Sequence, residues 1–206
     1  MADIINCAWT SDGTSSSDKC AGTAGFVAFY LGRVDDVDLV ATSSALSYSD
    51  ATESLLLPFT MNAGKKLKKI NVDKDTIHFF SKGDGKSRRY DDSIEVTVNG
   101  SNAAKRYNYR RMLGCCGMFA VGVKPSGAVE IMGLQPNGSG ILESIDKPLT
   151  NDSIEYDSDI ASNNGDTANS KYDFKFSGQS THGILVGEKD DGTPSMTIGE
   201  LDALTV

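Results

Sequence analysis

The stretch Ser93-Ile-Glu-Val-Thr-Val98 is the most regular in the chain, because apolar and polar residues alternate in it without interruption. Successive side chains of a β-strand point to opposite faces. The isoleucine and the two valines therefore lie on one face, and the serine, glutamate and threonine lie on the other. Tyr172-Asp-Phe-Lys-Phe-Ser177 repeats the pattern with three aromatic residues on one face. The sequence therefore predicts two strands that each bury one face and leave the other in water.

Working outward, four further segments have the composition of strands. They are Gly25–Leu31, Cys115–Val123, Val129–Leu134 and the short Gly183–Gly187, all rich in β-branched and aromatic residues. Lys124–Ala128 contains Pro and Gly and predicts a turn that joins the second and third of these as a hairpin.

The basic stretch Lys65–Phe80 alternates roughly and predicts one long strand, or two strands with a break near Asp73–Asp75. Ser81–Arg89 follows it as a polar, glycine-containing segment of nine residues, which we expect to be a loop longer than a tight hairpin turn.

One helix is predicted over Ala103–Leu113, which holds neither Pro nor Gly. Asn99 or Ser101 is placed to cap its start with a side-chain oxygen, and Gly114 stands where a left-handed residue ends a helix. The fold class predicted from these elements is mainly β: a β-sandwich or barrel with one flanking α-helix.

Along the chain we expect an N-terminal arm at 1–24, a β domain at 25–190 that includes a variable insertion at 135–170, and a C-terminal tail at 191–206. With 206 residues, of which 39% are hydrophobic and 23% charged, the chain has the composition of a folded domain rather than a disordered one.

Charge is distributed unevenly around the net value of −8. Residues 61–111 carry a net charge of +7, whereas residues 1–60 carry −6 and residues 143–206 carry −9. A basic middle between acidic ends can attract nucleic acid or pair with the acidic ends of the same or a neighbouring subunit. Because the whole chain is acidic, pairing with protein is the favoured interpretation.

Several classes of protein are disfavoured by what the sequence lacks. No apolar run approaches the roughly 20 residues that cross a bilayer, so no membrane role is expected. The first residues do not resemble a signal peptide. Cys7, Cys20, Cys115 and Cys116 form no C-x-x-C pair, so we expect free thiols rather than a zinc site.

No motif for catalysis or for a cofactor is found, and the chain is not expected to be an enzyme. The adjacent carboxylates Asp35-Asp36, Asp91-Asp92 and Asp190-Asp191 are expected to be solvated or to cap turns rather than to bind a cation. His78 is expected to pack within a strand rather than to act as a base.

Three blocks together carry a resemblance. They are Gly25–Asp36, the stretch Lys65–Leu134 with its Asn-Ala-Ala-Lys-Arg helix opening at Asn102, and Tyr172–Gly178. In this order they resemble the tail tube proteins (major tail proteins) of long-tailed bacteriophages, particularly the type found in phages of Bacteroidetes-like hosts.

The resemblance implies a virion protein, assembled in the cytoplasm of the host bacterium. Its subunits would form hexameric rings that stack into the tail tube, with the tape measure, terminator and baseplate proteins as further partners. Phage DNA would pass through the lumen without specific binding. The loop Ser81–Asp92 occupies the position that reaches the adjacent ring in that family. We therefore expect inter-ring contacts at Lys82, Asp84, Lys86, Arg88 and Arg89, with the basic members forming ion pairs.

Two alternatives stay open at this stage. One is another virion component of the same fold, such as a tail completion, baseplate-hub or capsid-associated protein. The other is a β-sandwich binding module, for instance for carbohydrate. A carbohydrate site calls for grouped exposed aromatic residues, and the single tryptophan is Trp9 in the arm.

Overall fold

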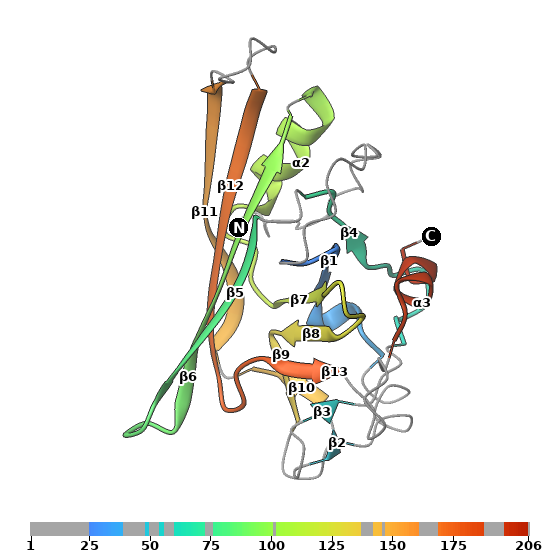
Figure 1. The fold of residues 1–206 in the computed structure, drawn as a ribbon, viewed down its shortest axis with the longest axis vertical. Helices are drawn as coiled ribbons and strands as arrows, with labels where there is room; N and C mark the ends of the chain where they lie inside the picture. The colour runs from blue at the N-terminus through green and yellow to red at the C-terminus, as the bar shows by residue number, and fades with distance from the viewer. Residues whose placement is uncertain are drawn as a thin grey trace, which may run out of the picture.

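A computed structural model describes residues 25–38, 48–49, 54–55, 60–72, 76–100, 102–136, 142–145, 147–160, 169–187 and 196–205. The predicted N-terminal arm, with Trp9, lies outside these residues. The described part is mainly β, as predicted, with one large sheet and few helices. Figure 1 shows that its long strands run along one side of the molecule and its short strands run across them.

The long strands form a four-stranded antiparallel unit in the order β11-β12-β6-β5. Their bounds are Ile77–Asp84 for β5, Arg89–Asn99 for β6, Lys147–Ile160 for β11 and Asn169–Ser180 for β12. The two stretches with the clearest alternation pair directly, because Phe174 lies opposite Val96 and Phe176 opposite Ile94. Their apolar faces therefore coincide, which is what sets the register of the ladder.

The short strands make the second part of the same 11-stranded sheet. β1 (Ala28–Arg33) pairs with β4 (Lys68–Lys69) and with β7 (Met118–Val123), and β7 continues to β8 (Val129–Met132) and β13 (Leu185–Gly187). β2 (Tyr48–Ser49) and β3 (Ser54–Leu55) complete the outer edge. A single pair, Leu149 with Met118, joins the two parts. β9 (Leu134–Pro136) and β10 (Leu142–Ser144) form a separate two-stranded sheet.

Two clusters of buried side chains hold these parts together. The first contains Ile94, Val96, Phe174 and Phe176 from the long strands together with Phe29 and other residues of the short strands and α2. The second lies on the other face of the short strands and includes Tyr30, Phe119, Ile131 and Leu201. The short strands are thus buried on both faces, which explains why β7 is apolar throughout its length.

The helix α2 spans Ala103–Met112, close to the predicted range, but its cap differs from the prediction. Asn102 is the N-cap residue, and its side-chain oxygen accepts a hydrogen bond of 2.7 Å from the backbone N–H of Lys105. Asn99, one of the two predicted cap residues, is instead the last residue of β6. Ser101, the other, lies outside the described residues. Gly114 has a φ of +75°, as expected of a residue that ends a helix.

Two predictions about the strands are corrected, and one of two alternatives is confirmed. Ser81–Arg89 is not a nine-residue loop, because pairing continues to Asp84 opposite Arg89 and leaves only residues 85–88 for the turn. Lys65–Phe80 gives two strands, which is the second of its two predicted alternatives: β4 pairs with β1 and β5 with β6. The strand predicted from Cys115 begins at Met118, because Gly117 has a φ of +71°.

Two further elements lie in segments whose structure the sequence left open, and a disulfide differs from expectation. Residues 147–160 of the expected insertion form β11, which pairs with β12. Within the expected C-terminal tail, Ile198–Ala203 forms the helix α3, and its Leu201 is buried. Cys115 is disulfide-bonded rather than a free thiol, whereas Cys116 is free and exposed.

The sheet is not closed into a barrel within the described residues. None of the helices that the structure describes is both long and apolar enough to cross a membrane.

Candidate functional site

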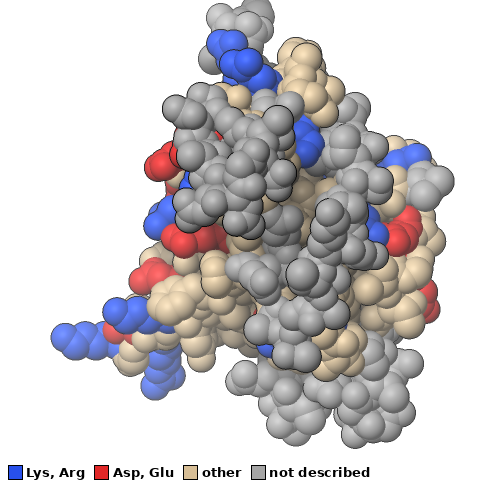
Figure 2. Space-filling view, turned by 45° about the horizontal axis from the view of Figure 1, so that its top comes forward, with Lys and Arg blue, Asp and Glu red and all other residues tan. Residues whose placement is uncertain are grey.

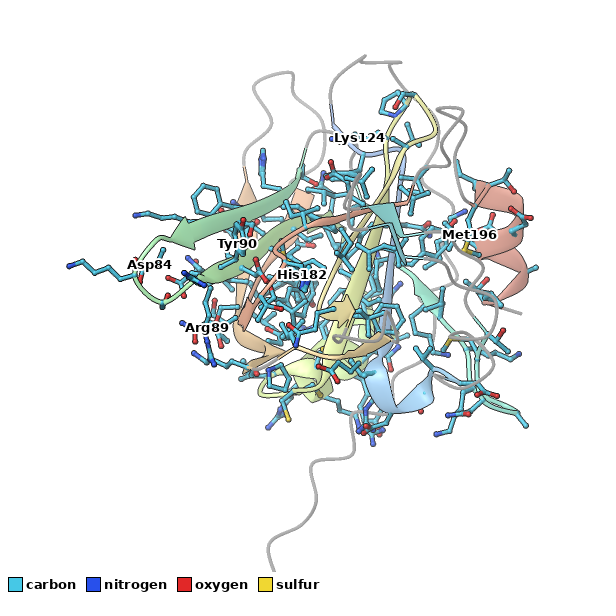
Figure 3. The ribbon with its side chains drawn as sticks, turned by 90° about the horizontal axis from the view of Figure 1, so that it is seen from below. Asp84, Arg89, Tyr90, Lys124, His182 and Met196 are labelled. Carbon is cyan, nitrogen blue, oxygen red and sulfur yellow. The ribbon has the colours of Figure 1, made fainter. Side chains whose placement is uncertain are left out.

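The β5–β6 hairpin projects from the body of the molecule and brings the five predicted contact residues together. Lys82 and Asp84 lie on β5, Lys86 and Arg88 in the turn, and Arg89 at the start of β6, and all five side chains are exposed. Figure 2 shows blue side chains gathered on this projection. In Figure 3, Asp84 and Arg89 lie at the tip, across the molecule from Met196 beside α3. The tip is therefore a basic, solvent-surrounded knob.

Asp84 shapes the turn of this knob. Its carboxylate accepts hydrogen bonds from the backbone N–H groups of Lys86 (3.1 Å) and Ser87 (3.4 Å), and its carbonyl oxygen accepts one from the N–H of Arg88 (2.9 Å). The bond from Lys86 is the main reason that the pKa of Asp84 lies below its usual value. Arg88 has a φ of +55°, an uncommon conformation that these bonds hold in place. Asp84 thus fixes the backbone of the turn that carries the neighbouring cationic residues.

The base of the hairpin is fixed by a buried carboxyl group that was not expected there. Asp92 is only 2% exposed, although adjacent carboxylates were predicted to be solvated or to cap turns. Its two oxygens accept hydrogen bonds from the hydroxyls of Ser81 (2.6 Å) and Ser180 (2.5 Å), so it joins three strands at one level. Burial raises the pKa of Asp92, and the two hydroxyl donors only partly oppose that rise.

The tight junction beside Asp92 leaves room only for a glycine. The backbone N–H of Gly183 donates to Ser180 Oγ at 2.8 Å. Gly183 has a φ of +67°, and a Cβ added there would stand 2.6 Å from Ser81 Oγ and 3.2 Å from the Tyr90 ring. The chain leaving β12 is therefore packed directly against the foot of the hairpin.

The face of the four-stranded unit that points away from the core is polar. Opposite charges face each other at Lys82 and Asp91 and at Glu95 and Lys175, whereas Glu155 lies opposite Asp173. Carboxylates outnumber basic side chains among the described residues of this face, which include Lys82, Asp84, Arg89, Asp91, Glu95, Lys147, Glu155, Asp157, Lys171, Asp173 and Lys175. A shallow groove of about 460 Å³ lies on it, lined mainly by polar side chains that include His78 and Thr97. His78 is exposed here rather than packed within the sheet.

Hydrogen bonds across the strands order this face. Asp173 accepts from the Thr97 hydroxyl at 2.5 Å and pairs with Lys171 at 2.8 Å. Burial alone would raise the pKa of Asp173, but the bonds from Lys171 and Thr97 outweigh it and the pKa is lowered. The same bond raises the pKa of Lys171. Asp173 and Lys171 therefore stay charged at neutral pH and hold each other in place.

Both outer strands of the four-stranded unit have one unpaired side within the described part of the chain. β5 pairs only with β6, and β11 pairs with β12 but otherwise meets another strand only at Leu149. β5 is eight residues long, and β11 is fourteen, of which Leu149 pairs with Met118 and Asn151 is bonded to Gly114 and Cys115. Strand edges of this length are templates for pairing with another chain.

Sequence reasoning located the cationic tip but missed the buried Asp92 and the long β11. A signal for β11 was present in Tyr156 and the apolar residues around it, but no strict alternation accompanies them. Among the described residues, no group of three or more His, Cys, Asp or Glu side chains is placed to hold a metal ion. Comparisons of the chain with protein-family profiles, curated proteins and solved structures find no match.

Proposed function

We propose that the protein is a tail tube subunit of a long-tailed bacteriophage, which forms hexameric rings that stack into the channel for the phage genome. The observation that carries this proposal is that, within the described residues, β5 has one unpaired side and β11 has one side that meets a neighbour only at Leu149 and Asn151. The open sheet is in this view one segment of a barrel that closes only across copies of the chain.

Strand direction supports a ring. The four strands alternate in direction, so the last strand, β5, runs opposite to the first, β11. When β5 of one copy pairs with β11 of the next, the antiparallel pattern continues unbroken. This contact is head-to-tail rather than twofold, and head-to-tail contacts generate closed rings when the rotation between copies allows it.

The polar face supports a lumen through which DNA passes. In the proposed ring it lines the hollow, and its carboxylates, such as Glu95, Glu155 and Asp157, outnumber its lysines in the described residues. A negative lining repels the phosphate backbone, so DNA would not adhere during passage. Within about 8–10 Å of the wall this repulsion survives physiological salt.

The hairpin tip supports contacts between stacked rings. It projects beyond the sheet along the direction of the long strands (Figure 1). Lys82, Lys86, Arg88 and Arg89 would pair there with acidic groups of the next ring, while Asp84 presets the turn. A prearranged loop loses less conformational entropy on docking. The tape measure, terminator and baseplate proteins would be further partners, and the mature location would be the tail of the virion.

The experiment that tests the function combines electron microscopy with hydrogen exchange. Purified protein is examined by light scattering and negative-stain microscopy over a range of concentrations, with rings or tubes of sixfold symmetry as the expected result. Amide exchange is then compared between dilute and assembled protein. We expect added protection in residues 77–84 and 153–157, because both edges become hydrogen-bonded. A monomer at every concentration, or assemblies in which both edges exchange as freely as in dilute protein, would contradict the proposal.

A further inference from the structure

The stretch of β11 from Ser153 to Asp157 pairs with β12 alone among the described residues. Earlier in the strand, Leu149 pairs with β7, and the backbone N–H and carbonyl of Asn151 bond to the segment that follows α2. A strand from another molecule that pairs with β11 must therefore do so along residues 153–157.

This stretch of β11 has an apolar face and a polar face. Ile154 packs against the first core cluster. Tyr156 lies opposite Tyr172 of β12, with the ring centroids 4.7 Å apart, yet it remains 42% exposed. Ser153 and Glu155 point the other way and line the groove on the polar face. The apolar face at this edge is thus incompletely covered within a single copy.

The open edge of β5 has the same two faces. Ile77 is buried in the first core cluster, and Phe79 packs against that cluster with its ring centroid 4.8 Å from that of Phe26. Phe79 is only partly buried, so its cover is also incomplete. His78 and Phe80 point to the polar face, and both are exposed. Incompletely covered apolar residues on an open strand edge are typical of a surface that another chain covers.

The faces restrict how the two edges can meet. Directly opposite residues of an antiparallel pair share a face, so the acceptable registers between β5 and β11 differ in steps of two residues. One of them puts Ile77 opposite Tyr156 and Phe79 opposite Ile154, so that both apolar residues of each edge are paired. A shift of two residues in either direction leaves a single apolar pair. Because buried apolar area is the main favourable term in association, the register with two apolar pairs is the most stable.

The polar face is compatible with the same register. It puts His78 opposite Glu155 and Phe80 opposite Ser153. An imidazole N–H is a hydrogen-bond donor and a carboxylate is an acceptor, so the first pair is complementary. The small serine leaves room beside the exposed phenylalanine ring. No two like charges lie opposite each other at these positions, which would weaken the pairing.

We infer that β5 of one copy pairs with β11 of a second copy of this chain in the register that puts Phe79 opposite Ile154 and His78 opposite Glu155. The inference rests on the proposed function, because the ring is what brings the two edges together. It adds that the first core cluster of each copy is completed by apolar side chains of its neighbour. The apolar layer then continues from copy to copy, and this layer fixes the position of each subunit along its neighbour.

Engineered disulfides at four positions of the polar face test the register. His78→Cys combined with Glu155→Cys, and Phe80→Cys combined with Ser153→Cys, are the two directly opposite pairs. The same four substitutions recombined, 78 with 153 and 80 with 155, are the matched controls, because each is shifted by two residues. Every variant also carries Cys116→Ser, which removes the exposed native thiol.

The bonds report on contacts between copies. Within one copy β6 and β12 separate β5 from β11, which places the two outer strands roughly 14 Å apart across the sheet. A disulfide spans at most about 7 Å between Cα atoms. Each variant is first examined by microscopy for rings, then oxidised mildly and analysed by non-reducing electrophoresis. A sample too dilute to assemble should give no crosslinked chains.

We expect a ladder of crosslinked chains that ends at six from both directly opposite pairs. It should form at least about tenfold faster than from the shifted pairs, whose Cα atoms would lie about 7–8 Å apart. If rings form but the shifted pairs react as fast as the opposite pairs, or if no pair reacts, the register is wrong and the ring proposal stands. If the wild type never assembles, both are wrong.

Discussion

The hydroxyl of Tyr30 donates a hydrogen bond of 2.7 Å to Asp202 Oδ1, and this bond ties the first described strand to the last helix. Lys69 on β4 donates to both oxygens of the same carboxylate, at 2.9 and 3.0 Å. Burial, followed by the bond to Asp202, raises the pKa of Tyr30, so the phenol remains a donor at any ordinary pH. The carboxylate of Asp202 therefore anchors α3 on the outer face of β1 and β4.

Replacing this anchor should loosen the C-terminal helix. Asp202→Ala removes the acceptor of the Tyr30 hydroxyl, and we expect the free energy of unfolding to fall by about 2 kcal/mol. Urea denaturation measures the change, and hydrogen exchange in residues 198–203 should quicken. Asp35→Ala is the matched control, because it removes an exposed ion pair with Arg33 and should cost less than about 0.5 kcal/mol. Equal losses in the two variants would contradict the anchoring role.

The buried Asp92 should make stability depend on pH in a defined direction. Because the pKa of Asp92 is raised in the folded state, the folded protein binds the proton more tightly than the unfolded chain. This contribution is complete below the unfolded pKa and is lost as pH rises through the folded pKa. Asp92→Asn should therefore gain stability relative to wild type as pH increases from about 4 to about 7.

The comparison needs a neighbouring carboxylate that lies in water. Asp91 is exposed on the next position of β6, and its charge adds to the rise in the pKa of Asp92, so Asp91→Asn should show a smaller gain of the same sign over the same pH range. Urea denaturation at several pH values measures both variants. A constant difference between Asp92→Asn and wild type across the range would show that burial of Asp92 has no such effect.

The glycine beside the hairpin should tolerate no side chain. Gly183→Ala places a Cβ in a left-handed conformation and against Ser81 and Tyr90, so we expect a loss of at least about 2 kcal/mol. Gly64 has a similar φ of +75° but no atom within 4 Å of an added Cβ. Gly64→Ala should thus report the backbone strain alone, about 1 kcal/mol. Thermal or urea unfolding of both variants isolates the cost of the clash.

Reversal of charge at the tip should prevent stacking without unfolding the subunit. Arg88→Glu combined with Arg89→Glu replaces two exposed cations by anions, and negative-stain microscopy should find rings but no long tubes. Lys65→Glu combined with Lys66→Glu changes the net charge equally at a distant exposed site and should leave tubes unchanged. If the variant with both arginines replaced formed normal tubes, the hypothesis that this loop makes ion pairs between rings would be wrong.

The adjacent cysteines should differ sharply in reactivity. In unreduced native protein, iodoacetamide should alkylate the exposed Cys116, whereas the disulfide-bonded Cys115 should react only after reduction. Peptide mass spectrometry locates the modification, and fully reduced, unfolded protein gives the reference for complete labelling. Alkylation of Cys115 before reduction would contradict the disulfide.

The strands that were predictable from the sequence are those in which one face is buried along the whole length. Residues 93–98 and 172–177 keep strict alternation because they pair with each other over the first core cluster. The sequence indicated only a weak extended segment near Ile154, and not the full length of β11. The register of β11 shifts between Lys147 and Thr150, between Asn151 and Ser153, and between Asp157 and Ile160, and each shift changes the phase of the pattern. The outer ends of β5 and β6 were expected to be a loop, because both of their faces meet water and no apolar alternation exists there.

At the candidate site, contacts between residues close in the sequence were predictable, and contacts between distant residues were not. The cationic cluster is local in sequence, so a single turn brings its members together. Burial of Asp92 depends on Ser180, 88 residues away, which no local pattern records. For α3 a local signal did exist, because Thr197 and Glu200 form the reciprocal hydrogen bonds of a capping box.

The alternating direction of the four long strands bears on the size of any closed assembly. Each copy contributes an even number of alternating strands, so the strands that meet between two copies always run in opposite directions. Strand pairing by itself is therefore compatible with a ring of five, six or seven copies. In the proposed hexameric ring, the choice of six would then come from the angle between neighbouring copies, which α2 and the crossing short strands would set from outside the sheet. Changes in these outer elements, rather than in the strand edges, would alter the bore of the channel.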